Sequence, residues 1–373
     1  MNKKLGFGVM RLPLVNPDDY SSIDIEAFKL MADYFISHGF SYFDTGYSYH
    51  NGNSESAFRE AVVKRHHRNS FTITDKMPSW LLTQKADLQR IFDEQLIRCG
   101  VEYFDYYWLH SLNKEYYTII ENLDGFGFLL KMKREGKVGH IGFSFHGDSI
   151  LLEQILKEHP ETEYVQLQLN YLDWESSAID SKRCYEVATK YGKPVVVMEP
   201  IKGGSLARVP VEAERLFKEY DSDYSPASWA LRFATSFDNV FMVLSGMSEM
   251  SQVEENIKLM DRLKPVGIEE MQLFSKAAKI INNSISIPCT ACHYCTEGCP
   301  VHICIPEYFE IYNSQKRFGK SKTVMDNSCV YYQSLSNTHG KASECINCGQ
   351  CEEHCPQHIS IRKSLKLVAK EFE

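Results

Sequence analysis

Ten of the twelve cysteines lie between Cys289 and Cys355, and eight of them form two runs with the same spacing. The runs are Cys289-x2-Cys292-x2-Cys295-x3-Cys299-Pro300 and Cys345-x2-Cys348-x2-Cys351-x3-Cys355-Pro356. Three thiolates on one tight loop can wrap three irons of a cubane, while the fourth cysteine leaves the loop in another direction. The spacing therefore predicts two [4Fe–4S] clusters.

The same spacing resembles that of bacterial two-cluster ferredoxins, in which the fourth cysteine of each run ligates the other cluster. We therefore expect the ligand sets Cys289, Cys292, Cys295 with Cys355, and Cys345, Cys348, Cys351 with Cys299. Zinc sites or disulfides are the alternative, but a third cysteine at the same spacing has no use in a zinc ribbon. The other cysteines, expected to be small apolar residues, are Cys99, Cys184, Cys304 and Cys329.

A second set of reactive side chains lies in the first third of the chain. Asp44, Lys76 and His110 end the second, third and fourth of a series of short apolar runs, and Tyr49 follows the second run. Each residue alone has a structural explanation, such as a turn, a solvated strand end or a core histidine. Together the four residues fill complementary catalytic roles, so the set indicates a catalytic site more specifically than any one of them does.

Those roles suit reduction of a carbonyl. Hydride addition to a carbonyl carbon leaves an alkoxide that needs a proton. A phenol can donate it if its pKa of about 10 is drawn toward neutrality. A nearby ammonium favours the phenolate, a carboxylate keeps that ammonium charged, and an imidazole can orient the carbonyl oxygen.

The elements that must carry these residues follow from hydrophobic periodicity. Short apolar runs alternate with amphipathic ones over the first 260 residues, as expected for strands covered on both faces. The predicted strands are Phe7–Leu12, Tyr42–Thr45, Phe71–Lys76, Tyr103–His110, Gly139–Phe145, Tyr164–Asn170, Pro194–Pro200 and Val240–Gly246. Eight such units predict an α/β fold of the (β/α)8 TIM-barrel type. A doubly wound sheet is the alternative, but no G-x-G-x-x-G turn follows an early strand.

The pattern changes near Pro265, which divides the chain into a predicted barrel, 1–265, and a small α-rich ferredoxin-like domain, 266–373. Helical periodicity is seen in 266–287 and around 306–315. Within the barrel, Ala86–Cys99 places Leu88, Ile91, Phe92, Leu96 and Cys99 on one face, and Ser149–His159 is similar. Polar residues at the carboxyl ends of barrel strands are then the catalytic candidates.

Residues 5–260 resemble the aldo-keto reductase family. The segment from Tyr42 to Glu55 is similar to the family pattern D-T-A-x-x-Y-G-x-G-x-S-E, and further similarities lie at Ile73–Lys76, Tyr106–His110 and Gly136–Ser144. With the cysteine tail, the chain resembles the branch that carries a ferredoxin-like C-terminus. The resemblance implies that Tyr49 donates the proton, that Lys76 and Asp44 tune it, and that His110 orients the substrate.

The resemblance also implies a nicotinamide cofactor, NADPH or NADH. Ser144 and Gln166 match the positions that hold the carboxamide, and Met198 stands where the family often has a stacking aromatic residue. Gly203 and Gly204 would let the backbone approach a pyrophosphate, although barrels bind flavin phosphate at the same end. The expected contacts of the adenosine half are Ser245, Gln252, Glu255 and Asn256. Gln252 replaces an arginine that would favour NADPH.

Composition restricts the partners and the cellular location that we expect for the protein. The net charge of −8 argues against a nucleic-acid partner, no apolar run approaches a membrane span, and no apolar segment typical of a signal peptide follows Met1. We expect a cytoplasmic oxidoreductase that acts on a small carbonyl-type substrate, with clusters serving a ferredoxin-like partner. Clusters pass single electrons and nicotinamide passes a pair. Two alternatives therefore stay open: a flavin- or substrate-linked enzyme without nicotinamide, and a non-catalytic electron-transfer module.

Overall fold

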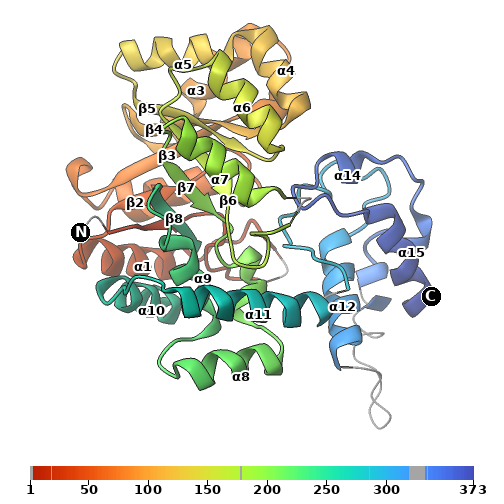
Figure 1. Cartoon of the computed structure of the whole chain (residues 1–373). Helices are drawn as coiled ribbons and strands as arrows, with labels where there is room; N and C mark the ends of the chain where they lie inside the picture. The colour runs from red at the N-terminus through yellow and green to blue at the C-terminus, as the bar shows by residue number, and fades with distance from the viewer. Residues whose placement is uncertain (1–2, 18, 177–178, 285, 319–331, 334) are drawn as a thin grey trace. The chain divides into compact units, whose positions relative to one another are not determined.

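The structure, a computed structural model, describes residues 3–17, 19–176, 179–284, 286–318, 332–333 and 335–373. In these residues eight parallel strands pair in chain order, and β8 pairs with β1, which closes the barrel (Figure 1). They are β1 Leu5–Gly8, β2 Tyr42–Asp44, β3 Thr72–Pro78, β4 Phe104–Leu112, β5 Val138–Phe145, β6 Tyr164–Gln168, β7 Val195–Met198 and β8 Val240–Gly246. The predicted barrel is confirmed, and each predicted strand overlaps one of these.

Seven of the eight strands differ from the prediction by at least one residue at an end, and β6 and β7 end two residues early, at Gln168 and Met198. β1 ends at Gly8 because only one further backbone hydrogen bond, from Val9 N–H to the Asp44 carbonyl, continues the pairing. β3 and β4 run to Pro78 and Leu112, two residues beyond the predicted ends. Lys76 and His110 therefore lie just inside the carboxyl ends of their strands.

The helices alternate with the strands as far as β8, and the elements described after β8 are helices. They are α1 Ile25–Ser37, α2 Ser54–Phe58, α3 Lys85–Cys99, α4 Lys114–Leu123, α5 Gly125–Arg134, α6 Ser149–Glu158, α7 Ser181–Lys190, α8 Val211–Tyr220, α9 Pro226–Thr235, α10 Met250–Asp261, α11 Ile268–Ser284, α12 Ile305–Phe318, α14 Gln350–Glu353 and α15 Ile361–Phe372. α3 is capped by Gly100, whose φ of 69° is the left-handed conformation that glycine adopts readily. The α-rich character predicted for the C-terminal part is confirmed.

Aromatic side chains fill much of the barrel core. Phe7 of β1 packs against Phe43 of β2 and against Phe28 and Phe35 of α1, with ring centroids 5.5 to 5.7 Å apart. Inside the barrel, a second cluster gathers buried side chains from β2, β4, β7 and β8, namely Tyr42, Trp108, Val196, Met242 and Leu244. This packing fixes the strands whose ends carry the candidate site.

The chain forms two compact units. The first contains residues 1–175, 180–200 and 230–266, and the second contains 176–179, 201–229 and 267–373. The segment 201–229, which follows β7 in the chain, thus belongs to the same unit as the cysteine runs. The boundary at 265 stays a prediction about domain organisation.

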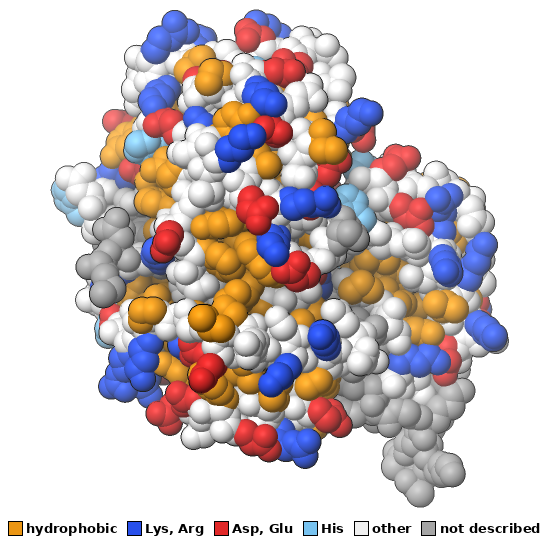
Figure 2. Space-filling view, in the orientation of Figure 1, with side chains coloured by type: hydrophobic (Ala, Val, Ile, Leu, Met, Phe, Trp, Pro, Cys, Tyr) orange, Lys and Arg blue, Asp and Glu red, His pale blue; other side chains and the backbone are white. Residues whose placement is uncertain are grey.

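The second unit has its own core. Phe217 of α8 and Trp229 both contact Phe274 of α11, with centroids 6.4 and 5.8 Å away. A further cluster of buried residues, including Tyr308 and Val368, packs α12 against α15. No helix in the described part of the chain is long and apolar enough to cross a membrane. Lys and Arg side chains are interspersed with Asp and Glu over the face shown in Figure 2, consistent with the small net charge.

Candidate functional site

A buried ion pair connects β2 and β3 in the first unit. The Lys76 ammonium donates to Asp44 Oδ1 at 2.6 Å and also to the Thr45 carbonyl. Both side chains are buried, with 1% exposure for Lys76 and 4% for Asp44. Because Asp44 pairs with Thr74 in the sheet register, Lys76 stands two residues further along the adjacent strand, where its side chain can reach the carboxylate.

Tyr49 and His110 lie beside this pair. Lys76 Nζ is 4.9 Å from the centroid of the Tyr49 ring, and the Tyr49 hydroxyl is 3.5 Å from His110 Nε2. The centroid of the Trp80 ring lies 5.0 Å from that of the His110 ring, and the two rings are tilted by 54°. The four residues predicted as a catalytic set are therefore brought together.

Burial sets the charge states of the set. Burial, assisted by the Lys76 charge, lowers the pKa of His110 well below its ordinary value, so the imidazole is neutral near pH 7. Burial also raises the pKa of Asp44, although Lys76 and Gln166 oppose the rise. The site can therefore offer a neutral imidazole and an ammonium close to one phenol.

A polar network behind Lys76 was not predicted from the sequence. Gln95 of α3 donates to Glu55 Oε1 and to the Lys76 carbonyl, both at 3.0 Å, and accepts from the Tyr107 hydroxyl. Arg98 donates to the other Glu55 oxygen at 3.2 Å. Four of the five α3 residues predicted to face the core are buried, whereas the fifth, Leu96, is half-buried and the adjacent Gln95 is buried. The network holds the β3 backbone at the lysine.

A carboxyl pair completes this network. Burial and the neighbouring Glu55 raise the pKa of Asp75 well above its ordinary value, and burial raises the pKa of Glu55. Both shifts favour the retention of a proton by this pair of buried carboxyls. Glu55 is the last residue of the segment that is similar to the family pattern. That similarity was the sequence feature that could have indicated this carboxyl pair.

The loop that carries Tyr49 departs from the family pattern at two positions. Gly46 replaces an alanine, and a Cβ there would lie 3.0 Å from the Tyr49 ring. His50 replaces a glycine and has a left-handed backbone, with φ 53°. The strained conformation is held by two contacts of the buried ring, since Leu12 N–H donates to Nε2 at 3.1 Å and Nδ1 lies 2.8 Å from the Tyr20 carbonyl.

The residues predicted to hold a carboxamide lie on adjacent strands, β5 and β6. Ser144 Oγ accepts from Ser111 N–H at 2.7 Å, and Gln166 Nε2 donates to Asp44 Oδ2 at 3.5 Å. Gln166 Oε1 is buried and has no hydrogen-bond partner among the described residues. An orphaned buried acceptor beside Asp44 fits a ligand that donates an N–H, as a carboxamide does. Met198 ends β7 and is half-buried.

The remaining cofactor candidates are divided between the units. Gly203 and Gly204, with φ 63° and 99°, lie in the second unit. In the first unit, Asn256 donates to Ser245 at 3.1 Å, so these two buried residues bond to each other. Gln252 accepts from Ser248 N–H at 2.8 Å, and Glu255 is exposed on α10. Glu255 is thus the member of the predicted adenosine set most open to solvent.

The eight motif cysteines fall into two groups in the second unit. Burial raises the pKa of Cys295, as do its neighbours Cys292, Cys289 and Cys355, with a smaller contribution from Cys351. Burial raises the pKa of Cys351 to about 11, and the contributing thiols are Cys345, Cys348 and Cys299. The second group also lines one small pocket. The largest thiol neighbours of Cys295 and of Cys351 are consistent with crossed ligand sets, and four thiols around one space fit a cubane.

The two runs repeat in backbone conformation as well as in spacing. Left-handed φ values occur at Ala291, His293 and His302 of the first run and at Asn347, Gly349 and His358 of the second, the same three offsets from Cys289 and Cys345. Five of these six residues are not glycine, so each conformation is strained unless the surroundings impose it. The shared strain indicates that both loops are shaped to wrap the same kind of group. Of the four other cysteines, Cys99, Cys184 and Cys304 are buried, and Cys329 lies outside the described residues.

Comparison with known proteins agrees with this geometry. Residues 4–278 match the family model of the aldo/keto reductase family, and residues 288–359 match a 4Fe-4S dicluster domain. The chain belongs to the aldo/keto reductase family, in the branch with a C-terminal ferredoxin-like domain.

Solved structures resemble the barrel. An aldo-keto reductase from Bacillus halodurans in its holo form is 23% identical, with a TM-score of 0.60, covering 74% of this chain and 92% of that one. An aldo-keto reductase from Klebsiella pneumoniae in complex with NADPH is 17% identical, with a TM-score of 0.57, covering 73% and 90%. At these identities the likeness concerns the fold.

A curated relative resembles a shorter stretch. The F420-dependent formate dehydrogenase subunit beta of Methanocaldococcus jannaschii is 32% identical over 73 residues, which are 20% of this chain. The match spans 18% of the length of that relative.

Proposed function

We propose that this aldo/keto reductase-type oxidoreductase moves reducing equivalents between a small carbonyl or related substrate, a nicotinamide cofactor and two [4Fe–4S] clusters. NADPH and NADH are the candidate nicotinamides, and a similar barrel from Klebsiella pneumoniae was solved with NADPH. We assign the protein to the cytoplasm, where reducing conditions keep cysteine thiolates available as ligands.

The observation that carries this proposal is the assembly of Asp44, Lys76 and His110 around the phenol of Tyr49. A nicotinamide, when bound, supplies hydride to the carbonyl carbon. Tyr49 donates the proton that the resulting alkoxide requires, and Lys76, with Nζ 4.9 Å from the ring centroid, stabilises the phenolate left behind. Asp44 holds Lys76 through the 2.6 Å ion pair. Neutral His110 donates a hydrogen bond to the carbonyl oxygen.

Cofactor orientation is assigned to Ser144 and Gln166. The orphaned Gln166 Oε1 accepts from the carboxamide nitrogen, which removes the cost of burying an unsatisfied acceptor. Met198 provides an adaptable thioether against the ring. Gly203 and Gly204 allow close approach of the pyrophosphate, and the adenosine half is assigned to Ser245, Gln252, Glu255 and Asn256.

The clusters are assigned to single-electron exchange with a ferredoxin-like partner. Cys348 is exposed, so the cluster of the second run would lie close enough to solvent for a partner to approach. Exchange between hydride and single electrons needs a relay that accepts a pair and releases electrons singly. A flavin is one group of that kind.

The test is the Tyr49→Phe variant in anaerobic turnover of para-nitrobenzaldehyde with NADPH and NADH. Losing the proton donor should lower kcat by about 100-fold or more, the usual scale of general acid catalysis. Nicotinamide affinity, measured by fluorescence titration, should stay within about threefold, because the hydroxyl is assigned no cofactor contact. Unchanged turnover would remove Tyr49 from the mechanism, and lost cofactor binding would show a structural role instead.

A further inference from the structure

A buried lysine lies in the second unit, in the segment that follows β7. Lys202 is 2% exposed, although lysine is almost never fully buried without a specific interaction. Its φ of 45° is left-handed, a conformation that costs a residue with a Cβ about 1 kcal/mol or more. Gly203 and Gly204 continue the left-handed run. A charged, buried and strained residue indicates a function for its side chain.

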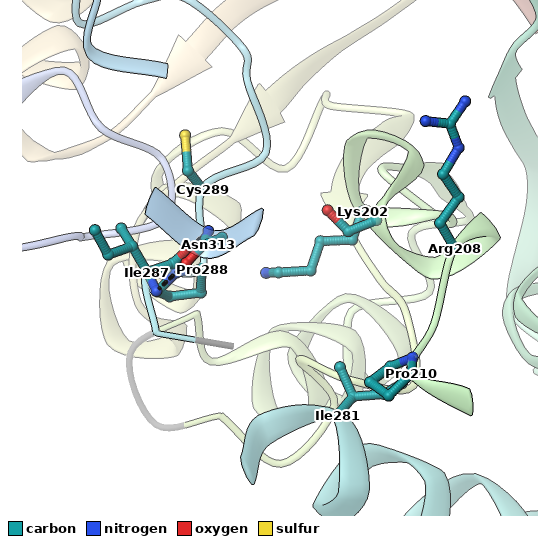
Figure 3. A pocket seen from close by; sticks show the side chains of 9 residues that line it. Lys202, Arg208, Pro210, Ile281, Ile287, Pro288, Cys289 and Asn313 are labelled. Carbon is teal, nitrogen blue, oxygen red and sulfur yellow. Dashed lines mark hydrogen bonds between the residues drawn. The ribbon is translucent and has the colours of Figure 1, made fainter. Parts of the chain in front are cut away.

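The neighbours of Lys202 belong to the ligand set of one predicted cluster. Lys202 Nζ donates to Gln357 Oε1 at 2.7 Å, and Gln357 is two residues beyond Cys355. Lys202 also lines a pocket with Cys289 and Pro288. Figure 3 shows the lysine side chain reaching across this pocket toward Ile287 and Pro288. Cys289 and Cys355 are expected to ligate the same cluster, the one of the first run.

The approach to Cys289 is itself fixed. Asn313 of α12 accepts from Ile287 N–H at 2.9 Å and donates to the Ile287 carbonyl at 2.6 Å. The ligand loop therefore enters the pocket at a defined position beside the ammonium. Charge near a cluster, together with hydrogen bonds and exposure, sets its reduction potential.

We infer that Lys202 is a residue that tunes the potential of the first-run cluster. Reduction adds one negative charge to a cluster that already carries four thiolates. A buried ammonium stabilises that added charge more strongly than an exposed cation, because water screens the latter. Lys202 thus raises the potential of the first-run cluster relative to that of the second. The inference rests on the proposed function in requiring both clusters to be present.

The experiment is protein-film voltammetry of the full-length holoprotein, with cluster content verified by iron and sulfide analysis. Cys348→Ser, which alters a ligand of the second-run cluster only, identifies the wave of each cluster. Lys202→Met keeps the length of the side chain and removes its charge, and should move the first-run wave to lower potential while the other stays in place. Lys202→Arg should restore most of the difference.

Two matched variants separate charge from packing. Arg208 lines the same pocket, but it is exposed and Figure 3 shows its guanidinium pointing away, so Arg208→Met should leave both waves in place. Gln357→Met removes the hydrogen bond and keeps the charge, and should shift the first-run wave less than Lys202→Met does. An unmoved first-run wave in Lys202→Met, or equal shifts of both waves, would overturn the inference. Purified protein that contains no iron and sulfide would instead overturn the proposed cluster ligands.

Discussion

His110 shows how one residue's environment decides its chemistry. Its imidazole is buried and lies near Lys76, and both effects lower its pKa. A histidine used as a proton donor would need a pKa near the working pH, whereas one that orients a carbonyl must stay neutral. The proposed division of labour, with Tyr49 as the acid and His110 as the orienting group, follows from this difference.

A pH profile tests that division. Because the pKa of folded His110 is lowered, kcat/KM for para-nitrobenzaldehyde should have no acid limb from His110 between about pH 6 and pH 8. The free energy of unfolding, in contrast to the rate, should depend on the titration of His110. Unfolded His110 binds a proton near its ordinary pKa of 6.5, so the contribution of the neutral folded form is lost as the pH falls below that value.

The control is His110→Asn, which is neutral at every pH. It should lower the rate but keep the shape of the profile, and its unfolding temperature should fall less steeply with acid than that of the unaltered protein. An acid limb near pH 6.5 that disappears in His110→Asn would show that His110 titrates at its ordinary pKa, and an alkaline limb that disappears in this variant would show that His110, not Tyr49, donates the proton.

Residue types and strand order were enough to predict which four residues meet at the barrel's carboxyl end. They were not enough to predict what surrounds them. His50 stands at a position where the family pattern has glycine, and its strained backbone is compensated by contacts to Leu12 and Tyr20, which are distant in the sequence. Such long-range compensation leaves no local periodicity to detect.

At the scale of elements, α3 connects the site to the packing of the barrel. Hydrophobic periodicity predicted its extent to within one residue and four of the five core residues, but it assigned Leu96 to the core, whereas the adjacent Gln95 is buried there. A glutamine can be buried there because Glu55, Tyr107 and the Lys76 carbonyl satisfy its side chain. Apolar patterns cannot indicate a helix face that is anchored by hydrogen bonds.

Gln95→Leu should be destabilising. The variant keeps a similar volume but leaves the Glu55 carboxyl and the Tyr107 hydroxyl without one partner each, which costs about 1–3 kcal/mol for each unsatisfied buried group. Thermal unfolding followed by circular dichroism measures the effect. Gln89→Leu, at a half-buried position of the same helix whose hydrogen bonds to Asp93 and Lys131 are exposed to solvent, is the control and should change stability by about 0.5 kcal/mol or less. Equal effects of the two variants would show that the network does not support the barrel.

At the scale of the whole molecule, the alternation of short and long apolar patterns predicted the barrel and the cysteine spacing predicted the second domain. The sequence did not indicate that residues 201–229 belong to the compact unit of the cysteine runs. That membership depends on contacts such as Phe217 with Phe274 and Lys202 with Gln357. These pairs are separated by 57 or more residues, and no local pattern encodes them.

Crossed ligation is a testable property of the whole second unit. Cys355→Ala should disturb the cluster of the first run and give the same electron paramagnetic resonance change as Cys292→Ala, because both remove ligands of one cluster. Cys299→Ala should instead match Cys348→Ala. Cys304→Ala, a buried cysteine outside both runs, should leave both clusters intact. If Cys355→Ala matched Cys348→Ala, the ligands would not cross.

The most direct test of electron flow between nicotinamide and clusters is anaerobic mixing in both directions, followed by visible absorption. Dithionite-reduced protein, freed of excess reductant, is mixed with NADP+ or NAD+, and oxidised protein is mixed with NADPH or NADH. The proposed function predicts that one nicotinamide couple exchanges electrons with the clusters, with one reduced nicotinamide formed or consumed for each pair of cluster electrons. Clusters that stay reduced with both oxidised nicotinamides, and stay oxidised with both reduced ones, would contradict it.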